Sequence, residues 1–234
     1  MAFKYETHMH TSEGSGCGRN TGAEQARAYK KRGYQGIIVT DHFINGYSKC
    51  PRNQPLSWEE KMMYVVAGYK AAKAEGDQIG LDVFLGWEFT IKGSDFLTYG
   101  LDWDFLMANP DLHLLGIEEY SALIRKSGGF LAQAHPYRVA DHIAYQLPVD
   151  PVYIDAVEVH NQSDVHYFST PGKESSNSKA LQFAQENNLP MQAGTDSHGI
   201  EHKMASGISL SHRAGSIFDI ISAIKNREAE LLIP

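Results

Sequence analysis

Histidine and carboxylate residues recur at the ends of short apolar segments, and no other feature constrains the chain as much. Each segment has the length and composition of a buried strand. Six strand ends with the same kinds of side chain indicate one shared site rather than scattered surface residues. The clusters are His8-Met9-His10, Asp41-His42, Glu88, His135-Pro136, Glu158 with Asn161, and Asp196-Ser197-His198.

The order of the segments predicts an α/β fold in which strands alternate with amphipathic helices. A closed parallel barrel fits better than an open sheet, because no glycine-rich nucleotide turn follows the first strand. We expect a single domain over residues 1–234, a length that can bury a full core. The predicted strands are 3–8, 34–40, 83–89, 96–101, 130–134, 156–159 and 191–193, and the predicted helices are 22–32, 57–75, 117–126, 177–188 and 214–226.

A barrel of this kind brings the carboxyl ends of its strands to one face, where active sites are built. Residues two apart in a strand point the same way, so His8 and His10 can reach one ion, as can Asp196 and His198. Mixed imidazole and carboxylate ligands suit Zn, Mn or Fe better than Mg or Ca, which prefer oxygen. The sequence therefore predicts a transition-metal centre.

Composition narrows the possible partners. The formal net charge is −7, so no basic excess is available for extended nucleic acid. No run approaches the roughly 18 apolar residues of a membrane span, and the start has no signal-peptide core, so we expect a cytoplasmic protein. The two cysteines, Cys17 and Cys50, form no disulfide framework. A small anionic substrate would need metal ions or a few placed cations.

The order of the motifs resembles that of the PHP (polymerase and histidinol phosphatase) superfamily over residues 6 to about 198. The resemblance implies a distorted (β/α)7 TIM-like barrel that holds two or three divalent ions and hydrolyses phosphoesters. The matching segments are Thr7-His8-Met9-His10-Thr11, Thr40-Asp41-His42, Gly86-Trp87-Glu88, Ala134-His135-Pro136, Glu158-Val159-His160-Asn161 and Gly194-Thr195-Asp196-Ser197-His198.

Carried over to this sequence, the resemblance implies seven metal ligands and leaves two positions that depart from the family pattern. Three ions need about nine protein ligands. Glu13 and Asp95 are closest to the two remaining positions, and we expect both to be ligands. The seven that match directly are His8, His10, His42, Glu88 as a bridging carboxylate, His135, Asp196 and His198.

The implied chemistry is attack by a metal-bridged hydroxide on a small phosphorylated substrate, a phosphomonoester of the histidinol phosphate type. Asp196 or a nearby histidine would protonate the leaving oxygen. Glu88, Asp196 and His198 are therefore candidate catalytic residues as well as ligands. The candidate phosphate-binding cations, all close to predicted ligands in sequence, are Arg138, Arg19, His202 and Lys203.

Three other functions stay open at this point. A metal-dependent amidohydrolase would use a similar barrel, although none of the six clusters contains the lysine that often bridges its metals. A non-catalytic PHP module and a plain metal-binding domain are the others. The sequence leaves open the identity of the phosphoester, the metal in the cell, the occupancy of a third metal site and the oligomeric state.

Overall fold

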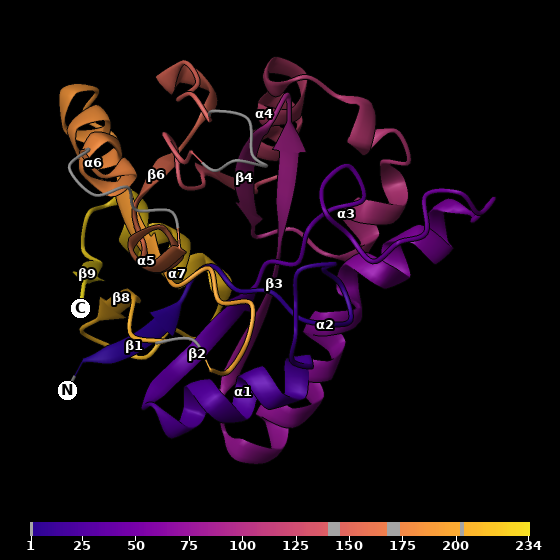
Figure 1. Ribbon diagram of the computed structural model, residues 1–234, viewed down its shortest axis with the longest axis horizontal. Coiled ribbons are helices and arrows are strands. Elements are labelled where there is room, and N and C mark those ends of the chain that lie inside the picture. Colours follow the sequence, from indigo (N-terminus) through magenta and orange to yellow (C-terminus); the bar gives the residue numbers. More distant parts are fainter. Residues whose placement is uncertain (1, 140–145, 168–173, 202–203) are drawn as a thin grey trace.

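The computed structural model describes residues 2–139, 146–167, 174–201 and 204–234, and its strands form one nine-stranded sheet (Figure 1). The order across the sheet is β7-β6-β5-β4-β3-β2-β1-β8-β9. The strands are β1 (Phe3–Glu6), β2 (Tyr34–Val39), β3 (Asp82–Ile91), β4 (Ser94–Tyr99), β5 (Phe130–Gln133), β6 (Ala156–Asn161), β7 (Met191–Gly194), β8 (Gly207–Leu210) and β9 (Glu230–Leu232).

Six of these strands run in the same direction, so their carboxyl ends meet at one end of the sheet. β1, β2 and β3 are parallel neighbours, as are β5, β6 and β7, and β4 lies antiparallel between the two groups. Beyond the ends of β1 and β7, Met9 pairs in parallel with Ser197. Asp196 N donates to His8 O at 2.8 Å, and His10 N donates to Ser197 O at 2.9 Å. The sheet therefore nearly closes into a barrel at its carboxyl end.

The structure differs from the predicted (β/α)7 barrel in two places. A tight hairpin joins β3 directly to β4, because Lys92 (φ 50°) and Gly93 (φ 85°) both adopt left-handed backbone conformations that reverse the chain in two residues. No helix separates those strands. At one edge of the sheet, β8 and β9 add an antiparallel extension to β1 that the sequence did not predict. All seven predicted strands are present.

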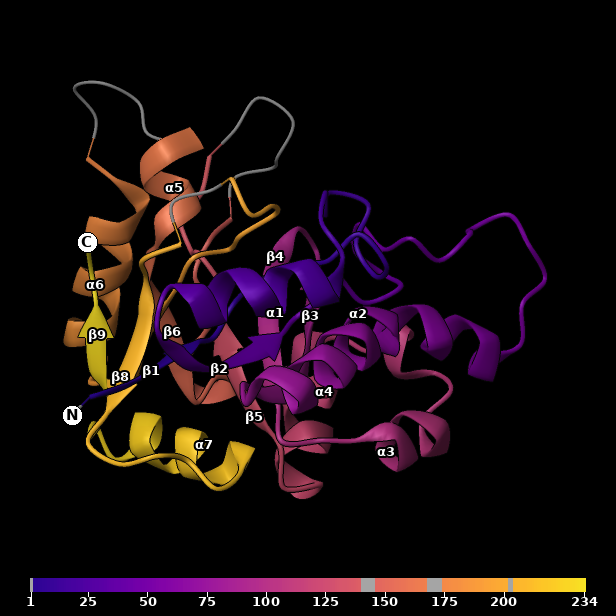
Figure 2. The ribbon, with the colours of Figure 1, turned by 90° about the horizontal axis from the view of Figure 1, so that it is seen from below.

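All five predicted helices are present, with ends shifted by a few residues, and two short helices, α3 and α5, are additional. Capping boxes begin α1 at Thr21 and α2 at Ser57. In Figure 2, α1 and α2 lie side by side along the sheet and α7 lies below it. The helices are α1 (Gly22–Lys31), α2 (Trp58–Ile79), α3 (Trp103–Ala108), α4 (Ile117–Lys126), α5 (Gln162–Tyr167), α6 (Ser176–Glu186) and α7 (Ile217–Lys225). None of the described helices combines the length and apolarity needed to cross a membrane.

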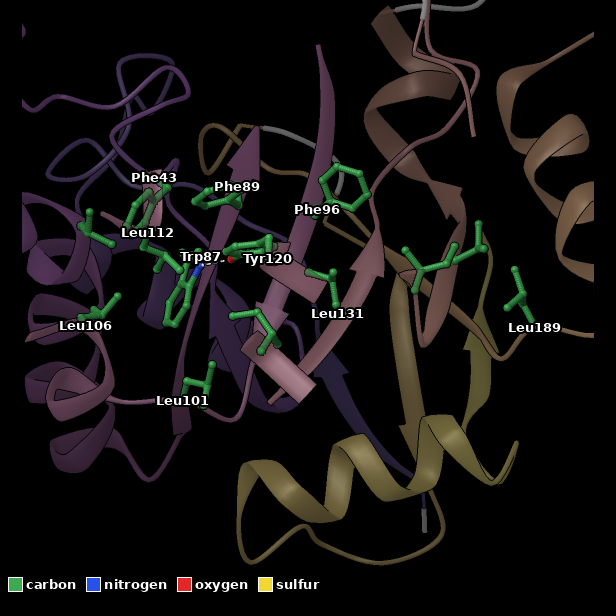
Figure 3. Packing of buried hydrophobic residues seen from close by; sticks show 14 of the residues in the cluster. Phe43, Trp87, Phe89, Phe96, Leu101, Leu106, Leu112, Tyr120, Leu131 and Leu189 are labelled. Carbon is green, nitrogen blue, oxygen red and sulfur yellow. Dashed lines mark hydrogen bonds between the residues drawn. The ribbon is translucent and has the colours of Figure 1, made fainter. Parts of the chain in front are cut away.

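Aromatic side chains on the outer face of β3 fix this strand in the core. Trp87 and Phe89 are fully buried outside the barrel, and Trp87 Nε1 donates to the hydroxyl of Tyr120 at 2.8 Å (Figure 3). The ring of Tyr120 stacks on Phe89 with centroids 3.9 Å apart. Because side chains alternate along a strand, these two anchors turn Glu88 toward the opposite, inner face. Packing thus fixes the direction of one predicted ligand.

The loop after His10 is held by a buried carboxylate and by a close helix contact. Asp41 accepts hydrogen bonds from Thr11 N at 2.7 Å, from Thr11 Oγ1 at 2.6 Å and from Ser15 Oγ at 2.6 Å. Gly68 of α2 lies against the same groups: a Cβ atom there would lie 2.0 Å from Thr11 Oγ1 and 2.2 Å from Asp41 Oδ2. The absence of a side chain at Gly68 lets α2 support the loop directly.

We predict that Gly68→Ala destabilises the protein, although alanine is intrinsically the better helix former by about 1 kcal/mol. The added methyl group must displace Thr11 or Asp41, and such overpacking typically costs about 1–3 kcal/mol. Urea unfolding of the metal-free protein measures the change. Gln78→Ala, at an exposed position of the same helix, should shift stability by less than about 0.5 kcal/mol. A Gly68→Ala protein as stable as the parent would contradict this account of α2 packing.

Candidate metal centre

Glu88 lies at the centre of four histidines that come from three different strand ends, those of β1, β2 and β5. Its side chain is 1% exposed. Oε1 lies 2.9 Å from His135 Nε2 and 3.4 Å from His8 Nε2. Oε2 lies 2.9 Å from His42 Nδ1 and 3.5 Å from His10 Nε2. The structure therefore brings five of the seven predicted ligands into contact around one carboxylate.

Asp196 is a second buried carboxylate beside the same histidines. Its Oδ1 lies 3.0 Å from His10 Nε2, 3.5 Å from His8 Nε2 and 3.7 Å from His198 Nε2. Asp196 has a φ of 51°, a left-handed conformation that aspartate adopts more readily than most residues. The hydrogen bond from its backbone N to His8 O holds that conformation in place. With Asp196 and His198, all seven predicted ligands lie in one cluster.

Glu158 orients two of the histidines from behind. It lies on β6 and is fully buried. Its Oε1 lies 2.9 Å from His8 Nδ1, and its Oε2 accepts from the backbone N of His135 at 3.0 Å and from Asn161 Nδ2 at 2.9 Å. A carboxylate behind an imidazole fixes the ring and places the N–H on the nitrogen that faces it. His8 Nε2 is thereby the nitrogen that is directed at the cluster.

The same arrangement holds for His10. Ser15 Oγ donates its proton to Asp41, so it can only accept from His10 Nδ1, which lies 3.1 Å away. The proton of His10 is therefore on Nδ1, and Nε2 presents a lone pair to Asp196 and Glu88. Burial lowers the pKa of His10 to about 3, so this ring is neutral. A neutral imidazole is the form that binds a metal.

Asp95 reaches the cluster through Gln146. Gln146 Nε2 donates to Asp95 Oδ2 at 2.7 Å, and its Oε1 lies 2.6 Å from His135 Nδ1. Since that oxygen can only accept, His135 carries a proton on Nδ1, and its Nε2, 2.9 Å from Glu88 Oε1, is the nitrogen that faces the cluster. Asp95, Glu88 and His135 offer ligand atoms within 4.8 Å of one another. The structure thus places Asp95 where a third group of ligands would need it.

Several buried nitrogen and oxygen atoms of the cluster face one another without a hydrogen bond, and a cation between them would satisfy them. His8 Nε2, His42 Nδ1 and Glu88 Oε2 are all buried without a hydrogen-bond partner. A buried polar atom without a partner costs about 1–3 kcal/mol. Burial alone would raise the pKa of Glu88, but the imidazoles of His42 and His8 hold it well below its usual value, so the carboxylate is charged. Divalent ions fit this donor set.

Glu13 lies elsewhere than predicted. Its two carboxylate oxygens accept from the backbone N of Gly22 at 3.2 and 3.1 Å, at the first turn of α1. The unpaired N–H groups and the positive end of the helix dipole stabilise a carboxylate there. Among the described residues, no group of clustered ligand atoms includes Glu13.

The same loop instead contributes Cys17, which the sequence analysis missed. Cys17, His10 and His42 offer ligand atoms within 4.8 Å of one another. Burial raises the pKa of the Cys17 thiol, but hydrogen bonds to His198 and His42 outweigh this and lower it overall. Considering thiols as well as carboxylates in the loop after His10 would have identified this residue.

The four predicted phosphate-binding residues differ in where they lie relative to the cluster. Arg138 is 5% exposed, and it donates from Nε to Asp164 Oδ1 at 2.5 Å and from Nη2 to Asp196 Oδ2 at 2.6 Å. Arg19 lies at the surface with its Nη2 2.9 Å from Glu201 Oε1. His202 and Lys203 lie outside the described residues.

The cluster opens into a cavity of about 670 Å³. This volume accommodates a small molecule rather than a polymer. Its described lining includes a single arginine or lysine, Arg138, and an exposed aromatic ring, Tyr47. The ligand groups that line it are His10, Cys17, His42, Glu88, Asp95, His135, Asp196 and His198.

Comparison with known families and structures gives matches of two kinds. The model of the PHP-associated family matches residues 174–229, a range that includes α6, β7, β8 and α7. A search of curated protein sequences gives no significant match.

Solved structures share the fold at low sequence identity. A two-domain protein from Bacteroides vulgatus that contains a predicted PHP-like metal-dependent phosphoesterase superposes with a TM-score of 0.71 at 16% identity, covering 99% of this chain and 64% of that one. PsfC from Pseudomonas syringae has a TM-score of 0.68 at 16% identity, covering 100% and 92%. An amidohydrolase from Chromobacterium violaceum with bound sulfate has a TM-score of 0.57 at 13% identity, covering 98% of both chains. At these identities the likeness shows a shared fold.

We predict that Glu88→Gln removes most of the metal affinity of the protein, because Glu88 contacts all four histidines around it. Free metal at 100 times Kd should stabilise the parent by about 2.7 kcal/mol, which is on the order of 5–10 °C in Tm for a chain of this size. Elemental analysis and thermal unfolding with Zn, Mn or Fe(II) measure both effects. Glu59→Gln, at an exposed position of α2, is the control. Full metal content in Glu88→Gln would contradict the central role of Glu88.

Proposed function

We propose that this chain, which belongs to the PHP superfamily, is a metal-dependent hydrolase of small phosphoesters. The motif order, the PHP-associated match at residues 174–229 and the shared fold support the family. One observation carries the function: a single cavity is lined by a large set of clustered metal-ligand groups, with Glu88 shared between them. A shared carboxylate is suited to bridging two cations.

The ligand groups define two or three proposed ion positions. His8, His10 and Glu88 form one group, which Asp196 would complete, because its Oδ1 lies 3.0 Å from His10 Nε2. His42 lies beside Glu88 and His198 beside Asp196, so these two histidines would hold a second ion. Divalent ions held there would supply a nucleophile by lowering the pKa of water and would neutralise charge on the phosphoryl oxygens. Asp95, Glu88 and His135 would form the third ion position, in agreement with the prediction of Asp95 as a ligand.

The protein groups have separate roles in this proposal. Glu158 and Gln146 hold the histidine rings, while Arg138 holds Asp196 through the 2.6 Å contact to Oδ2. Asp196 and His198 both line the cavity, and either can pass a proton to the leaving oxygen. His198 is the more exposed of the two, at 22%, so it is closer to solvent for proton exchange.

The cavity favours a substrate with one phosphate. Among its described lining residues, Arg138 is the only arginine or lysine, and two carboxylates already neutralise it. The ions would therefore provide most of the positive charge for the substrate, at the cluster itself. A phosphomonoester places its charge at a single point, whereas a polyphosphate or a polynucleotide would extend negative charge along walls without cations.

An amidohydrolase is the second candidate, because one structural neighbour carries that name. The same neighbour binds sulfate, a tetrahedral oxyanion with the shape and charge of a phosphate monoester. No lysine is found among the described residues that line the cavity, so a bridging lysine of the kind used by many amidohydrolases has no candidate there. We therefore favour phosphoester hydrolysis, and substrate tests can distinguish the two.

We predict that the protein hydrolyses aryl phosphate monoesters faster than aryl diesters and does not hydrolyse aryl amides. Activity should require Zn, Mn or Fe(II), disappear with chelator and return on metal addition. Asp196→Asn should lower kcat by about 10²- to 10⁴-fold, the range of general acid–base catalysis. Asp104→Asn, on the exposed face of α3, should leave kcat unchanged. Faster cleavage of the amides than of every phosphoester would favour the amidohydrolase function instead.

We predict that Arg138→Ala lowers kcat/KM by about 10- to 100-fold, which matches the 1.5–3 kcal/mol of a hydrogen bond to a charged group. Steady-state kinetics together with metal analysis make the measurement, and metal content should stay unchanged. Arg213→Ala is a matched control, because Arg213 also pairs with an aspartate, Asp82, but lies exposed and outside the cavity. Full activity of Arg138→Ala on every phosphoester would show that Arg138 contributes neither to substrate binding nor to the position of Asp196.

A further inference from the structure

Cys17 is the one residue of the cluster that neither the strand-end pattern nor the family motifs predict as a ligand. Its thiol lines the cavity, and its Sγ lies within 4.8 Å of the ligand nitrogens of both His10 and His42. The second cysteine of the chain, Cys50, lies outside the cavity. The two thiols therefore form a natural comparison within one molecule.

A separate observation indicates that a cation belongs beside Cys17. Glu88 Oε2 belongs to a side chain that is 99% buried and has no hydrogen-bond partner, and it faces the two histidines of the Cys17 group. The distances are 2.9 Å to His42 Nδ1 and 3.5 Å to His10 Nε2. His42 Nδ1 also has no hydrogen-bond partner. An ion at this point would satisfy both unpartnered atoms.

The backbone on both sides of Cys17 is hydrogen-bonded to the loops that carry two other predicted metal ligands, His42 and His198. Gly16 N donates to Tyr47 O at 2.7 Å, in the loop after His42, and Arg19 N donates to His198 O at 2.7 Å. Cys17 is thus held between two predicted ligands, and its thiol can bind without a rearrangement of the loop. Glu13, four residues earlier, is engaged at the start of α1 and does not compete for this place.

We propose that Cys17 is a metal ligand, acting with His42 and the shared Glu88. The proposal rests on the metal centre of the proposed function and assigns one of its ion positions a sulfur ligand. Thiolate is a soft ligand that prefers Zn or Fe(II) to Mn, so this position should discriminate against Mn. The other positions, with imidazole and oxygen ligands, should be less selective.

Cobalt(II) provides a direct test, because a cobalt–thiolate bond gives an intense near-ultraviolet charge-transfer band that nitrogen and oxygen ligands do not give. We expect this band in the cobalt-loaded parent and in Cys50→Ser, and its loss in Cys17→Ser. Cys17→Asp should bind as much cobalt as the parent but show no band. Visible d–d bands count the bound ions independently of sulfur.

Alkylation of the two thiols gives a second readout that does not depend on a substitution. Zinc should slow the reaction of Cys17 with iodoacetamide by about 100-fold at 100 times Kd, while Cys50 reacts at an unchanged rate, and peptide mass mapping separates the two. A parent protein that binds cobalt by its d–d bands but shows no charge-transfer band would overturn the Cys17 assignment alone. A protein that binds no cobalt would overturn the proposed function as well.

Discussion

The pairing of two short segments beyond the ends of β1 and β7 holds the candidate centre together. His8-Met9-His10 and Asp196-Ser197-His198 are almost two hundred residues apart in sequence, yet two backbone hydrogen bonds and the Met9–Ser197 bridge align them side by side. Alternation along each segment then directs both histidines of the first and both ligands of the second into one space. Neither segment alone could bind an ion tightly.

Charge explains why this space suits metal ions. Glu88, Asp196 and Glu158 are buried and all three contact the ring of His8, an arrangement that a folded protein tolerates only when positive charge compensates it. Arg138 compensates Asp196 from one side. His8, His10 and His135 each use Nδ1 for a hydrogen bond outside the centre and turn Nε2 toward Glu88 or Asp196. The ligand atoms are therefore already in place, and bound cations would neutralise the buried carboxylates.

Much of this arrangement was predictable because it follows from local rules. Ligands at strand ends are recognisable when a buried strand precedes them, as Ile37 to Val39 precede Asp41 and His42. The parallel order of the strands then brings the ligands together. The hairpin at Lys92 and Gly93 and the added strands β8 and β9 depend on turn geometry and edge pairing, which the periodicity of the sequence does not reveal.

Loop residues were predicted less well, since no periodicity fixes where a loop side chain points. Glu13 was expected at the metal and lies instead at the start of α1, where the helix provides N–H donors. Cys17 reaches the cluster because hydrogen bonds on both sides fix its loop. Arg138 was expected to bind phosphate, but it donates hydrogen bonds to two carboxylates of the protein, those of Asp164 and Asp196. Such outcomes depend on tertiary contacts.

Anomalous diffraction at the zinc and manganese edges, from crystals grown without chelator, tests the central claim most directly. We expect at least two anomalous peaks inside the cluster, with Glu88 within about 2.5 Å of two of them and with His8, His10 and Asp196 among the other ligands. No peak in the cluster after soaking in either metal, or peaks only at surface carboxylates, would contradict the account that this cavity is a metal-dependent active site.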